Sequence, residues 1–380
     1  MKFQINRSQL IEGVQDVMKA VSSRTTIPIL TGIKMVVHSE GMTLTGSDSD
    51  ISIERLIPME ENGEVNLEIQ KPGSIVLQAR YFSEIVKKLP NDTVEIEVGE
   101  RFETKLRSGA SEFSLVGLDP EEYPRLPQIE EQNVFSIQGD LFRQIIRQTV
   151  FAVSTSETRP ILTGVNIKLE DNILSCVATD SHRLAQRTAR IETDTEGLSF
   201  QNVVIPGKSL NELSKIVEES AELVQIVVTD NQVLFKTKNT LFFSRLLDGN
   251  YPDTSKLLPS ESKTTLVLST KDFLQAIDRA SLLAREGRNN VVKLATIDSQ
   301  TVEISSNSPE IGKVYEHVAT QSMEGEELKI SFNAKYMIDA LKAMDCSEIN
   351  VLFTGAMRPF LITPVDNEII KQLILPVRTY

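Results

Sequence analysis

The stretch that decides the fold is Pro28-Ile29-Leu30-Thr31-Gly32, because the same five residues return as Pro160-Ile161-Leu162-Thr163-Gly164. The two copies lie 132 residues apart, and Ser47-Asp48-Ser49 returns at that offset as Thr179-Asp180-Ser181. Solenoid repeats are about 20–50 residues long, so a repeat of this length is a whole domain. The 380 residues hold the period almost three times, and we therefore expect a third, diverged copy.

Two amphipathic helices in each copy extend the alignment into the third repeat. Apolar residues spaced three and four apart predict one helix near the start of each copy and a second one later. The first helices carry Leu10, Ile11, Val14, Val17, Met18 and Val21; then Phe142, Ile145, Ile146, Thr149 and Val153; then Phe273, Leu274, Ile277, Ala280 and Ala284. The second helices carry Phe82, Ile85, Val86 and Leu89; then Leu210, Leu213, Ile216 and Val217; then Met337, Ile338, Leu341 and Met344. A basic residue is expected just before each second helix: Arg80, Lys208 and Lys335.

Short runs of alternating polarity between these helices are typical of β-strands. In the first copy the runs cover residues 33–38, 42–46, 51–57, 94–98, 102–108 and 112–118. Each copy is thus predicted to hold two half-units of strand, helix and three strands, an α+β fold with helices on one side of antiparallel sheet. Proline-bearing loops at 123–127 and 251–259 interrupt the pattern. The predicted domains are residues 1–128, 129–259 and 260–380.

Composition places the chain among soluble globular proteins. Its apolar content of 40% supports full cores, and no segment is long and apolar enough to span a bilayer. The first residues lack the apolar run of a signal peptide, so we expect a cytoplasmic protein without a membrane partner. Two cysteines, Cys176 and Cys346, are too few for a disulfide framework, and we expect both thiols to be buried. No pattern indicates a metal or a cofactor.

The distribution of charge is more informative than the net charge of −13, which alone argues against a nucleic-acid partner. The predicted helices and adjoining turns hold sixteen basic and twelve acidic residues, from Arg7 to Asp345, a total of +4. The remainder of the chain then carries −17. A mildly positive helical face on an acidic body suits a polyanion, but exposed helix faces are also ordinarily laced with ion pairs. Charge alone leaves both interpretations open.

A search for catalytic patterns finds no Walker sequence, HExxH, CxxC or GxSxG. One cluster has chemical residues, Thr179-Asp180-Ser181-His182-Arg183. Neighbouring residues point to different sides, so Asp180, Ser181 and His182 do not readily converge as a catalytic trio. A simple turn after a strand is one alternative. Because His182 and Arg183 occur only in the middle copy, a binding site particular to that copy is another.

Beyond the repeats, several stretches resemble the bacterial DNA polymerase III beta subunit, the replicative sliding clamp. The resemblance covers Met1 to Tyr380. It is carried by Lys2-Phe3, Arg24 with Ile27-Pro28-Ile29-Leu30, Arg107-Ser108-Gly109 through Phe113-Ser114-Leu115, Ala178 through Ala185, Asp248-Gly249 with Tyr251-Pro252-Asp253, and Leu375-Pro376-Val377-Arg378.

The resemblance implies a non-catalytic processivity factor in DNA replication, a head-to-tail homodimer that closes a ring around double-stranded DNA. Twelve helices would line the hole, with the sheets outside. Helices about 9–10 Å apart and about 10 Å thick would leave an opening of roughly 25–28 Å, enough for duplex DNA and a layer of water. A closed ring needs little affinity for phosphates, because escape requires opening an interface. The implied partners are DNA, a second copy of the chain, the DNA polymerase III catalytic subunit, the clamp-loader ATPase, and other polymerases and repair proteins with clamp-binding peptides.

The resemblance also implies functional residues. It assigns DNA contacts to Arg24, Arg80 and Lys208, and charge placement adds Arg147. A hydrophobic peptide pocket between the second and third domains would be formed by Leu162, Thr179, Ser181, His182, Arg183, Leu184, Pro252, Leu257, Leu373 and Leu375. The dimer interface would join Phe113 and Leu115 of one chain to Leu282 and Leu283 of the other, although the two leucines alone could equally be core residues.

Two other functions compete with the clamp. The same triplicated fold and pocket could serve as an interaction scaffold that does not bind DNA. An enzyme centred on Asp180 and His182 is the other alternative.

Overall fold

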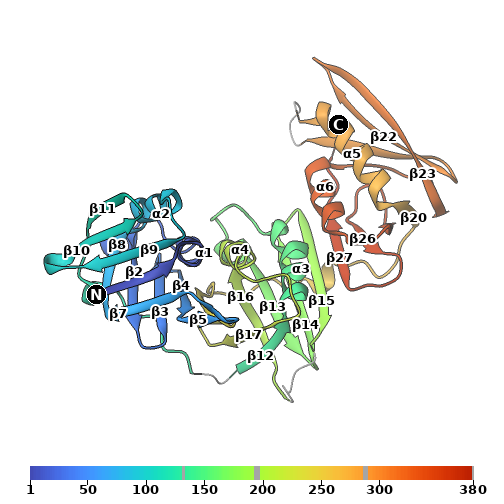
Figure 1. Ribbon diagram of the computed structural model, residues 1–380. Helices are drawn as coiled ribbons and strands as arrows, with labels where there is room; N and C mark the ends of the chain where they lie inside the picture. Colours follow the sequence, from blue (N-terminus) through green and yellow to red (C-terminus); the bar gives the residue numbers. More distant parts are fainter. Residues whose placement is uncertain (131–132, 192–196, 286–289, 379–380) are drawn as a thin grey trace. The chain divides into compact units, whose positions relative to one another are not determined.

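The computed structural model describes residues 1–130, 133–191, 197–285 and 290–378, which pack as two compact units (Figure 1). Unit 1 comprises residues 1–139 and 212–246, and unit 2 comprises residues 140–211 and 247–380. The division does not follow the predicted repeats, because the middle repeat contributes to both units.

Each repeat consists of two half-units of strand, helix and three strands, as the sequence predicts. The first repeat contains β1 (Lys2–Asn6), α1 (Arg7–Met18), β2 (Gly32–His38), β3 (Gly41–Ser47) and β4 (Ile51–Pro58), then β8 (Gly73–Gln78), α2 (Ala79–Lys88), β9 (Thr93–Val98), β10 (Glu103–Ser108) and β11 (Ser111–Val116). Between its halves lie β5 (Glu60–Glu61), β6 (Glu64–Val65) and β7 (Leu67–Lys71). These three strands were not predicted, because they are short or rich in charged residues.

The second and third repeats follow the same order. The second contains β12 (Asn133–Gln138), α3 (Gly139–Thr149), β13 (Gly164–Glu170), β14 (Ile173–Thr179) and β15 (Arg183–Arg190), then β16 (Phe200–Pro206), α4 (Gly207–Leu213), β17 (Leu223–Val228), β18 (Gln232–Lys236) and β19 (Thr240–Arg245). The third contains β20 (Thr264–Ser269), α5 (Thr270–Ala284), β21 (Val291–Asp298), β22 (Thr301–Ser308) and β23 (Gly312–Gly325), then β24 (Lys329–Asn333), α6 (Ala334–Ala343), β25 (Glu348–Phe353), β26 (Phe360–Pro364) and β27 (Ile370–Ile374).

The repeated five-residue string forms the same structure in both copies. Residues Pro28–Thr31 (η1) and Pro160–Thr163 (η5) each make a single 3₁₀ turn, and the following glycine begins a strand. Proline suits the first position of such a turn because its φ is already fixed and its missing N–H is not needed there. The threonine closes each turn, since its hydroxyl donates to the proline carbonyl at 2.8 Å in η1 and 2.7 Å in η5.

Sheets that run from one repeat into the next explain why the units cut across the repeats. In unit 1, β19 of the second repeat pairs antiparallel with β4 of the first, in a sheet of order β12-β17-β18-β19-β4-β3-β2-β8. In unit 2, β15 of the second repeat pairs antiparallel with β27 of the third, in a sheet of order β16-β13-β14-β15-β27-β26-β25-β20-β23-β22-β21-β24. A further sheet of unit 1 has the order β11-β10-β9-β1-β7.

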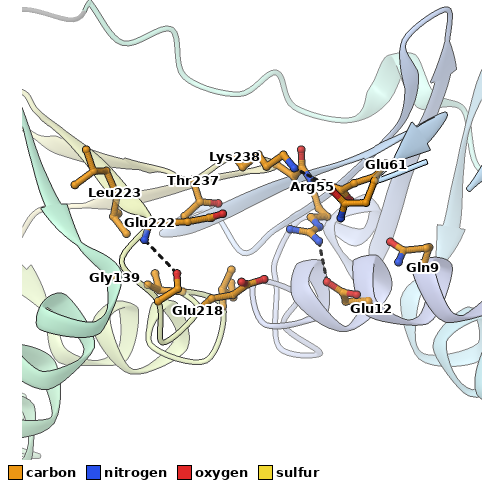
Figure 2. A pocket seen from close by; sticks show the side chains of 16 residues that line it. Gln9, Glu12, Arg55, Glu61, Gly139, Glu218, Glu222, Leu223, Thr237 and Lys238 are labelled. Carbon is orange, nitrogen blue, oxygen red and sulfur yellow. Dashed lines mark hydrogen bonds and ion pairs between the residues drawn. The ribbon is translucent and has the colours of Figure 1, made fainter. Parts of the chain in front are cut away.

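In unit 1, α1 and α2 contact each other, and α1 packs against β3 and β4. The apolar face of α1 is buried through Leu10, Val14 and Val17, as its spacing predicts. Beside the β4–β19 junction lies a polar pocket of about 300 Å³ (Figure 2). Its wall includes Arg55, which donates to Glu12 at 2.8 Å.

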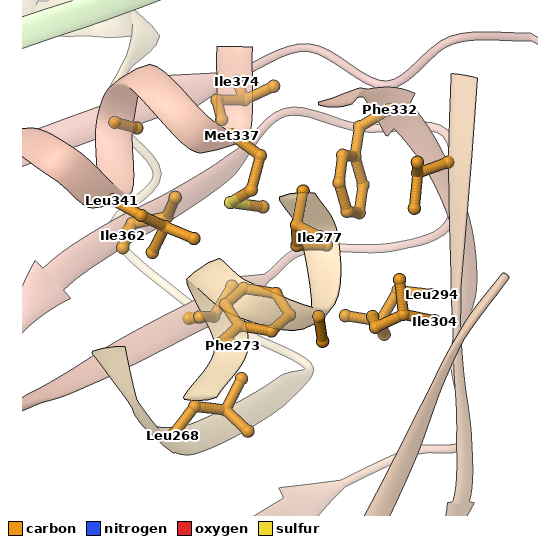
Figure 3. Close-up of a cluster of buried hydrophobic side chains, with 14 of the residues drawn as sticks. Leu268, Phe273, Ile277, Leu294, Ile304, Phe332, Met337, Leu341, Ile362 and Ile374 are labelled. Atoms are coloured by element: carbon orange, nitrogen blue, oxygen red, sulfur yellow. The ribbon is translucent and has the colours of Figure 1, made fainter. Parts of the chain in front are cut away.

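In unit 2, α5 and α6 lie side by side over a large apolar core (Figures 1 and 3). Phe273 and Ile277 of α5 meet Met337 and Leu341 of α6 in this core. Ser269 caps α5, since its side chain accepts the N–H of Asp272.

Some predicted boundaries are wrong. The helix α4 ends at Leu213, although its apolar pattern continues to Val217, which is buried in turns beyond the helix. Phe102 was predicted to begin a strand but lies just before β10, in a short turn where its φ is 64°. Arg80, Lys208 and Lys335 are the second residues of α2, α4 and α6 and do not precede these helices.

Candidate functional site

An apolar cluster in unit 2 joins the second repeat to the third, and we call it the groove cluster. It forms where β15 pairs with β27, with Leu184 directly opposite Leu373. Its buried members are Leu162, Val177, Leu184, Val204, Tyr251, Leu361 and Leu373, and Ile161, Leu247, Leu258, Leu352 and Leu375 pack against them partly buried.

The structure brings four of the predicted pocket residues together in this cluster: Leu162, Leu184, Leu373 and Leu375. Leu257 is not among them, because its side chain at the end of a short turn is 50% exposed. Its neighbour Leu258 packs on the cluster instead. Sequence alone does not distinguish two adjacent leucines in a loop. Val177 and Tyr251 also belong to the groove cluster but were not among the predicted pocket residues. Tyr251 precedes Pro252 in the loop that the sequence predicts.

A cavity of about 670 Å³ adjoins the groove cluster. Val177, Tyr251, Pro252 and Leu258 form part of its wall, and polar residues of β13 to β16 form much of the rest. Tyr251 is held firmly, because its oxygen accepts the N–H of Thr179 at 3.0 Å. Burial raises the pKa of the Tyr251 hydroxyl to about 12, so the phenol is neutral at physiological pH. The cavity thus has a mostly polar wall that meets the groove cluster at Val177, Tyr251 and Leu258.

The predicted residues Thr179 to Arg183 form a tight turn between β14 and β15. The Asp180 carboxylate accepts the N–H groups of His182 at 2.9 Å and Arg183 at 3.0 Å. Thr179 accepts the N–H of Ser181 and donates to the carbonyl of Arg183. Ser181 has a φ of 76°, a left-handed conformation that costs a residue with a side chain some strain.

The turn is inherited from the repeat. At the same offset, Asp48 accepts two N–H groups in the same manner, and Ser49 has a φ of 79°. The first two repeats therefore share the turn conformation, whereas the matching Ser306-Asn307-Ser308 of the third repeat lies within β22. The side chains of His182 and Arg183 remain particular to the second repeat.

Arg183 is buried and fully engaged, and does not present a free cation to a ligand. Its guanidinium contacts Asp180 at 3.0 Å and Asp339 of α6 at 2.7 Å, and donates to the Phe151 carbonyl. It also lies over the ring of Tyr336, 4.5 Å from the centroid. A buried arginine is stable only with such partners. Arg183 thus fixes the turn against the third repeat.

His182 remains exposed at the rim, where its ring stacks on Tyr336 with 6.5 Å between centroids. The carbonyl of His182 accepts the N–H of Leu375, which links the turn to the groove cluster. Asp180 is committed to the backbone and to Arg183 and no bond to the His182 ring is present in the described structure. The geometry therefore gives no support to a catalytic pairing of Asp180 with His182.

The predicted DNA contacts are exposed, but their surroundings differ. Arg80 and Lys208 lie in the first turns of α2 and α4, where the helix dipole disfavours a cation. Helix stability therefore does not explain a basic residue there. Lys335 occupies the same place in α6 and is paired with Asp339 at 2.9 Å. Arg80 makes no ion pair with any residue in the described ranges.

Arg24 and Arg147 complete the predicted set. Arg24 is exposed in the loop that follows α1. Arg147 of α3 is paired with Asp345 at 2.8 Å, with both side chains more than half exposed. An exposed pair of this kind is weak, so phosphate can compete for the arginine. Two charges of the helical count, Glu286 and Arg288, lie outside the described residues.

The predicted interface residues lie on the edge strand β11 and near the end of α5. Phe113, 39% exposed, and Leu115, partly exposed, belong to β11, which pairs only with β10 among the described strands. Leu282 is 59% exposed near the end of α5, and Leu283 is partly buried. Leu282 is therefore not a core residue of the single chain.

Three further features of the chain concern metal ligands, membrane-spanning helices and thiols. No group of acidic, histidine and cysteine residues able to hold a metal is found in the described part of the chain. None of the described helices is long and apolar enough to cross a membrane. Both cysteines are free; Cys176 is buried, which raises its pKa to about 12, whereas Cys346 is only partly buried.

Comparison with known proteins gives one consistent result over the whole chain. Three family models match in order: the N-terminal domain of the DNA polymerase III beta subunit over residues 1–127, its central domain over 136–253 and its C-terminal domain over 255–378. The beta sliding clamps of Bacillus subtilis and Halalkalibacterium halodurans are 65% and 59% identical over 100% of both chains. A crystal structure of the Bacillus subtilis DNA polymerase sliding clamp has a TM-score of 0.96 at 65% identity, again covering 100% of both chains.

These matches confirm the resemblance and the clamp fold that it implies, and with them a non-catalytic role as a replicative processivity subunit. The chain belongs to the DNA polymerase III beta-subunit family, the beta sliding clamps.

Proposed function

We propose that this chain encircles duplex DNA as a head-to-tail homodimer and tethers the DNA polymerase III catalytic subunit to its template. The observation that carries this proposal is the repeated way in which one repeat joins the next. We also propose that the chain acts in the cytoplasm. Its three domains would be residues 1–128, 129–259 and 260–380.

Both internal junctions follow one rule. The last strand in the first half of one repeat pairs with the last strand in the second half of the next repeat. The pairs are β4 with β19 and β15 with β27. Two strands remain to be joined by the same rule. These are β11, at the end of the first repeat, and the part of β23 at 312–319, whose only described partner is β22. Neither strand has a partner on this edge among the described residues, so pairing between two copies would continue the head-to-tail order and close a ring.

Side-chain burial supports this third junction. Phe113 lies opposite Leu106 in the hairpin β10–β11, the place that Phe242 takes opposite Phe235 in β18–β19. Phe242 is 1% exposed beside β4, whereas Phe113 is 39% exposed on an unpaired edge. An open edge with exposed apolar residues invites pairing with another chain. A second copy would bury Phe113 as β4 buries Phe242.

The two internal junctions also define the register of the third. Arg55 lies opposite Thr240, and Arg187 opposite Ile370. Glu316 takes the place of Arg55 in the hairpin β22–β23, and Ser111 takes the place of Thr240 in the hairpin β10–β11. Ser111 of one copy should therefore lie opposite Glu316 of the next. It follows that Phe113 faces Val314 and Ser114 faces Lys313, with Leu282 and Leu283 of α5 beside them.

We propose that the helices face the DNA. Basic residues in the first turns of α2 and α4 suit phosphate better than they suit their own helices. Arg24, Arg80, Lys208 and Arg147 would make weak, exchangeable phosphate contacts, in keeping with a ring that must slide. The ring, rather than affinity, would retain the DNA.

We propose that clients bind at the groove cluster and its adjoining cavity. Leucine or phenylalanine anchors would contact Leu162, Leu184, Leu373 and Leu375, while His182 and Pro252 border the peptide. The clients would be the polymerase, the clamp-loader ATPase, and other polymerases and repair proteins with such peptides.

The test is retention of the loaded protein on circular DNA before and after the circle is cut. We expect stable retention on the intact circle and rapid loss from the linear product at the same salt concentration. Equal retention on both forms would contradict the ring, since affinity alone would then hold the protein.

A further inference from the structure

The three repeats share a polar contact that pins each junction strand to a helix of its own repeat. The strand residue occupies the equivalent position in each of the three hairpins, where it pairs with a residue that has an apolar or thiol side chain. The three hairpin pairs are Arg55 with Leu44, Arg187 with Cys176, and Glu316 with Ile304.

The helix residue is equally regular, being the tenth residue of α1, α3 or α5: Asp16, Gln148 and Arg279. Arg55 Nε lies 3.8 Å from Asp16 Oδ2, and Arg55 also bonds Glu12 (Figure 2). Arg187 Nε donates to Gln148 Oε1 at 2.8 Å. Arg279 donates twice to Glu316, at 2.8 and 2.7 Å. We call these contacts the strand clips.

The third strand clip differs from the other two in polarity and in exposure. In the first two the arginine is on the strand, whereas in the third it is on the helix. The side chains of Arg55 and Asp16 are 16% and 13% exposed, and Arg187 is 5% exposed as a residue. The side chains of Arg279 and Glu316 are 54% and 22% exposed.

The difference in exposure follows the sheets. Strands β4 and β15 each have a neighbour from another repeat, β19 or β27, that covers the clip. The matching edge of β23 has no such neighbour among the described residues. A strand added there would cover Arg279 and Glu316 as β19 covers Arg55.

We propose that the Arg279–Glu316 pair is an assembly determinant, nearly neutral for folding of the single chain and required for closing the ring. This inference rests on the proposed head-to-tail dimer and adds residues to it. The occupant of the edge is β11 of a second copy, because β11 takes the place in its half-unit that β19 and β27 take in theirs.

Physical chemistry separates the two roles. In the single chain an exposed ion pair contributes little, so its loss changes the folding equilibrium only a few-fold. Once a second copy covers the pair, removal of Arg279 or Glu316 leaves the other charge buried without a counterion. We expect about a 30-fold weakening for each junction, and hence about 1,000-fold in the dimer Kd of a ring with two junctions, which corresponds to about 4 kcal/mol.

The experiment compares Glu316→Gln, Arg279→Gln and the charge reversal Arg279→Glu with Glu316→Arg. The matched control is Glu212→Gln, which breaks the Glu212–Lys215 pair away from the proposed junction. The side chains of this pair are 22% and 57% exposed, close to the values for Glu316 and Arg279. Sedimentation equilibrium gives the dimer Kd, and thermal unfolding at dilutions where the chain is monomeric gives the stability of the single chain.

We expect both single variants to weaken the dimer about 1,000-fold, the reversal to restore most of the affinity, and the control to leave it unchanged. A dimeric wild type with unchanged affinity in both single variants would overturn this inference and leave the ring standing. A loss of monomer stability that matches the loss of affinity would overturn it too. A wild type that never dimerises would overturn the ring itself, and this inference with it.

Discussion

Replacing Phe113 by alanine should open the ring without unfolding the chain. A phenylalanine side chain buries about 200 Å² when fully covered, and 39% of Phe113 is exposed in the single chain. About 80 Å² therefore remains to be buried by a second copy, which corresponds to about 2 kcal/mol at 25 cal/mol per Å². A closed ring has two junctions, so the dimer should lose about 4 kcal/mol, or about 1,000-fold in Kd.

Sedimentation equilibrium over a wide concentration range measures this change. The matched control is Leu223→Ala, which truncates a side chain that is 61% exposed on β17, a strand paired on both sides. The control should dimerise as the wild type does, and both variants should keep the wild-type circular dichroism. A Phe113→Ala chain that dimerises normally would refute the reasoning, because the edge of β11 would then not be the contact surface.

Three further predictions follow from the same structure. Arg80→Ala with Lys208→Ala should weaken binding to short duplexes and reduce the slope of log K against log salt concentration by about one for each lost phosphate contact; an unchanged slope in a salt titration would exclude both residues from the DNA face. Leu184→Ala should weaken a leucine-bearing client peptide about ten-fold or more while the dimer Kd stays constant, and calorimetry that finds wild-type peptide affinity would remove the groove assignment. Arg107 holds the pKa values of Glu112 and Glu95 below their usual 4.5, so its contribution to stability should be present at pH 7 and lost as the pH falls through the lowered values. The free energies of urea unfolding of Arg107→Gln and wild type should differ at pH 7 and converge once the pH is below those lowered pKa values, and a constant difference would contradict the assignment.

Most of the architecture was predictable because it is repeated. The offset between Pro28 and Pro160 fixed the alignment, and a turn conformation as unusual as that of Ser49 recurs at Ser181. Alternation and spacing then located most strands and helices. The exceptions are local. Val217 remains buried although the helix ends at Leu213, because burial alone does not require helical hydrogen bonds.

The site was less predictable, because its details depend on contacts between repeats. Sequence identified His182 and Arg183 as particular to the middle repeat, but not that Asp339, 156 residues away, neutralises Arg183. Likewise nothing in the sequence shows that Arg147 meets Asp345. Leu257 and Leu258 are equivalent in pattern, and only the path of the loop turns Leu258 toward the groove cluster.

The most direct test of the central claim is a covalent closure of the ring. Cysteines at Ser114 and Lys313, which the register places opposite each other in neighbouring copies, would lie within reach of a disulfide, since paired antiparallel strands have Cα atoms about 4.5–5.5 Å apart. The variant would be loaded on circular DNA, oxidised, and then exposed to denaturant. We predict a cross-linked dimer that stays on the circle under denaturing conditions and leaves when the circle is cut. Absence of the cross-link, or a cross-linked dimer that leaves intact circles, would contradict the account.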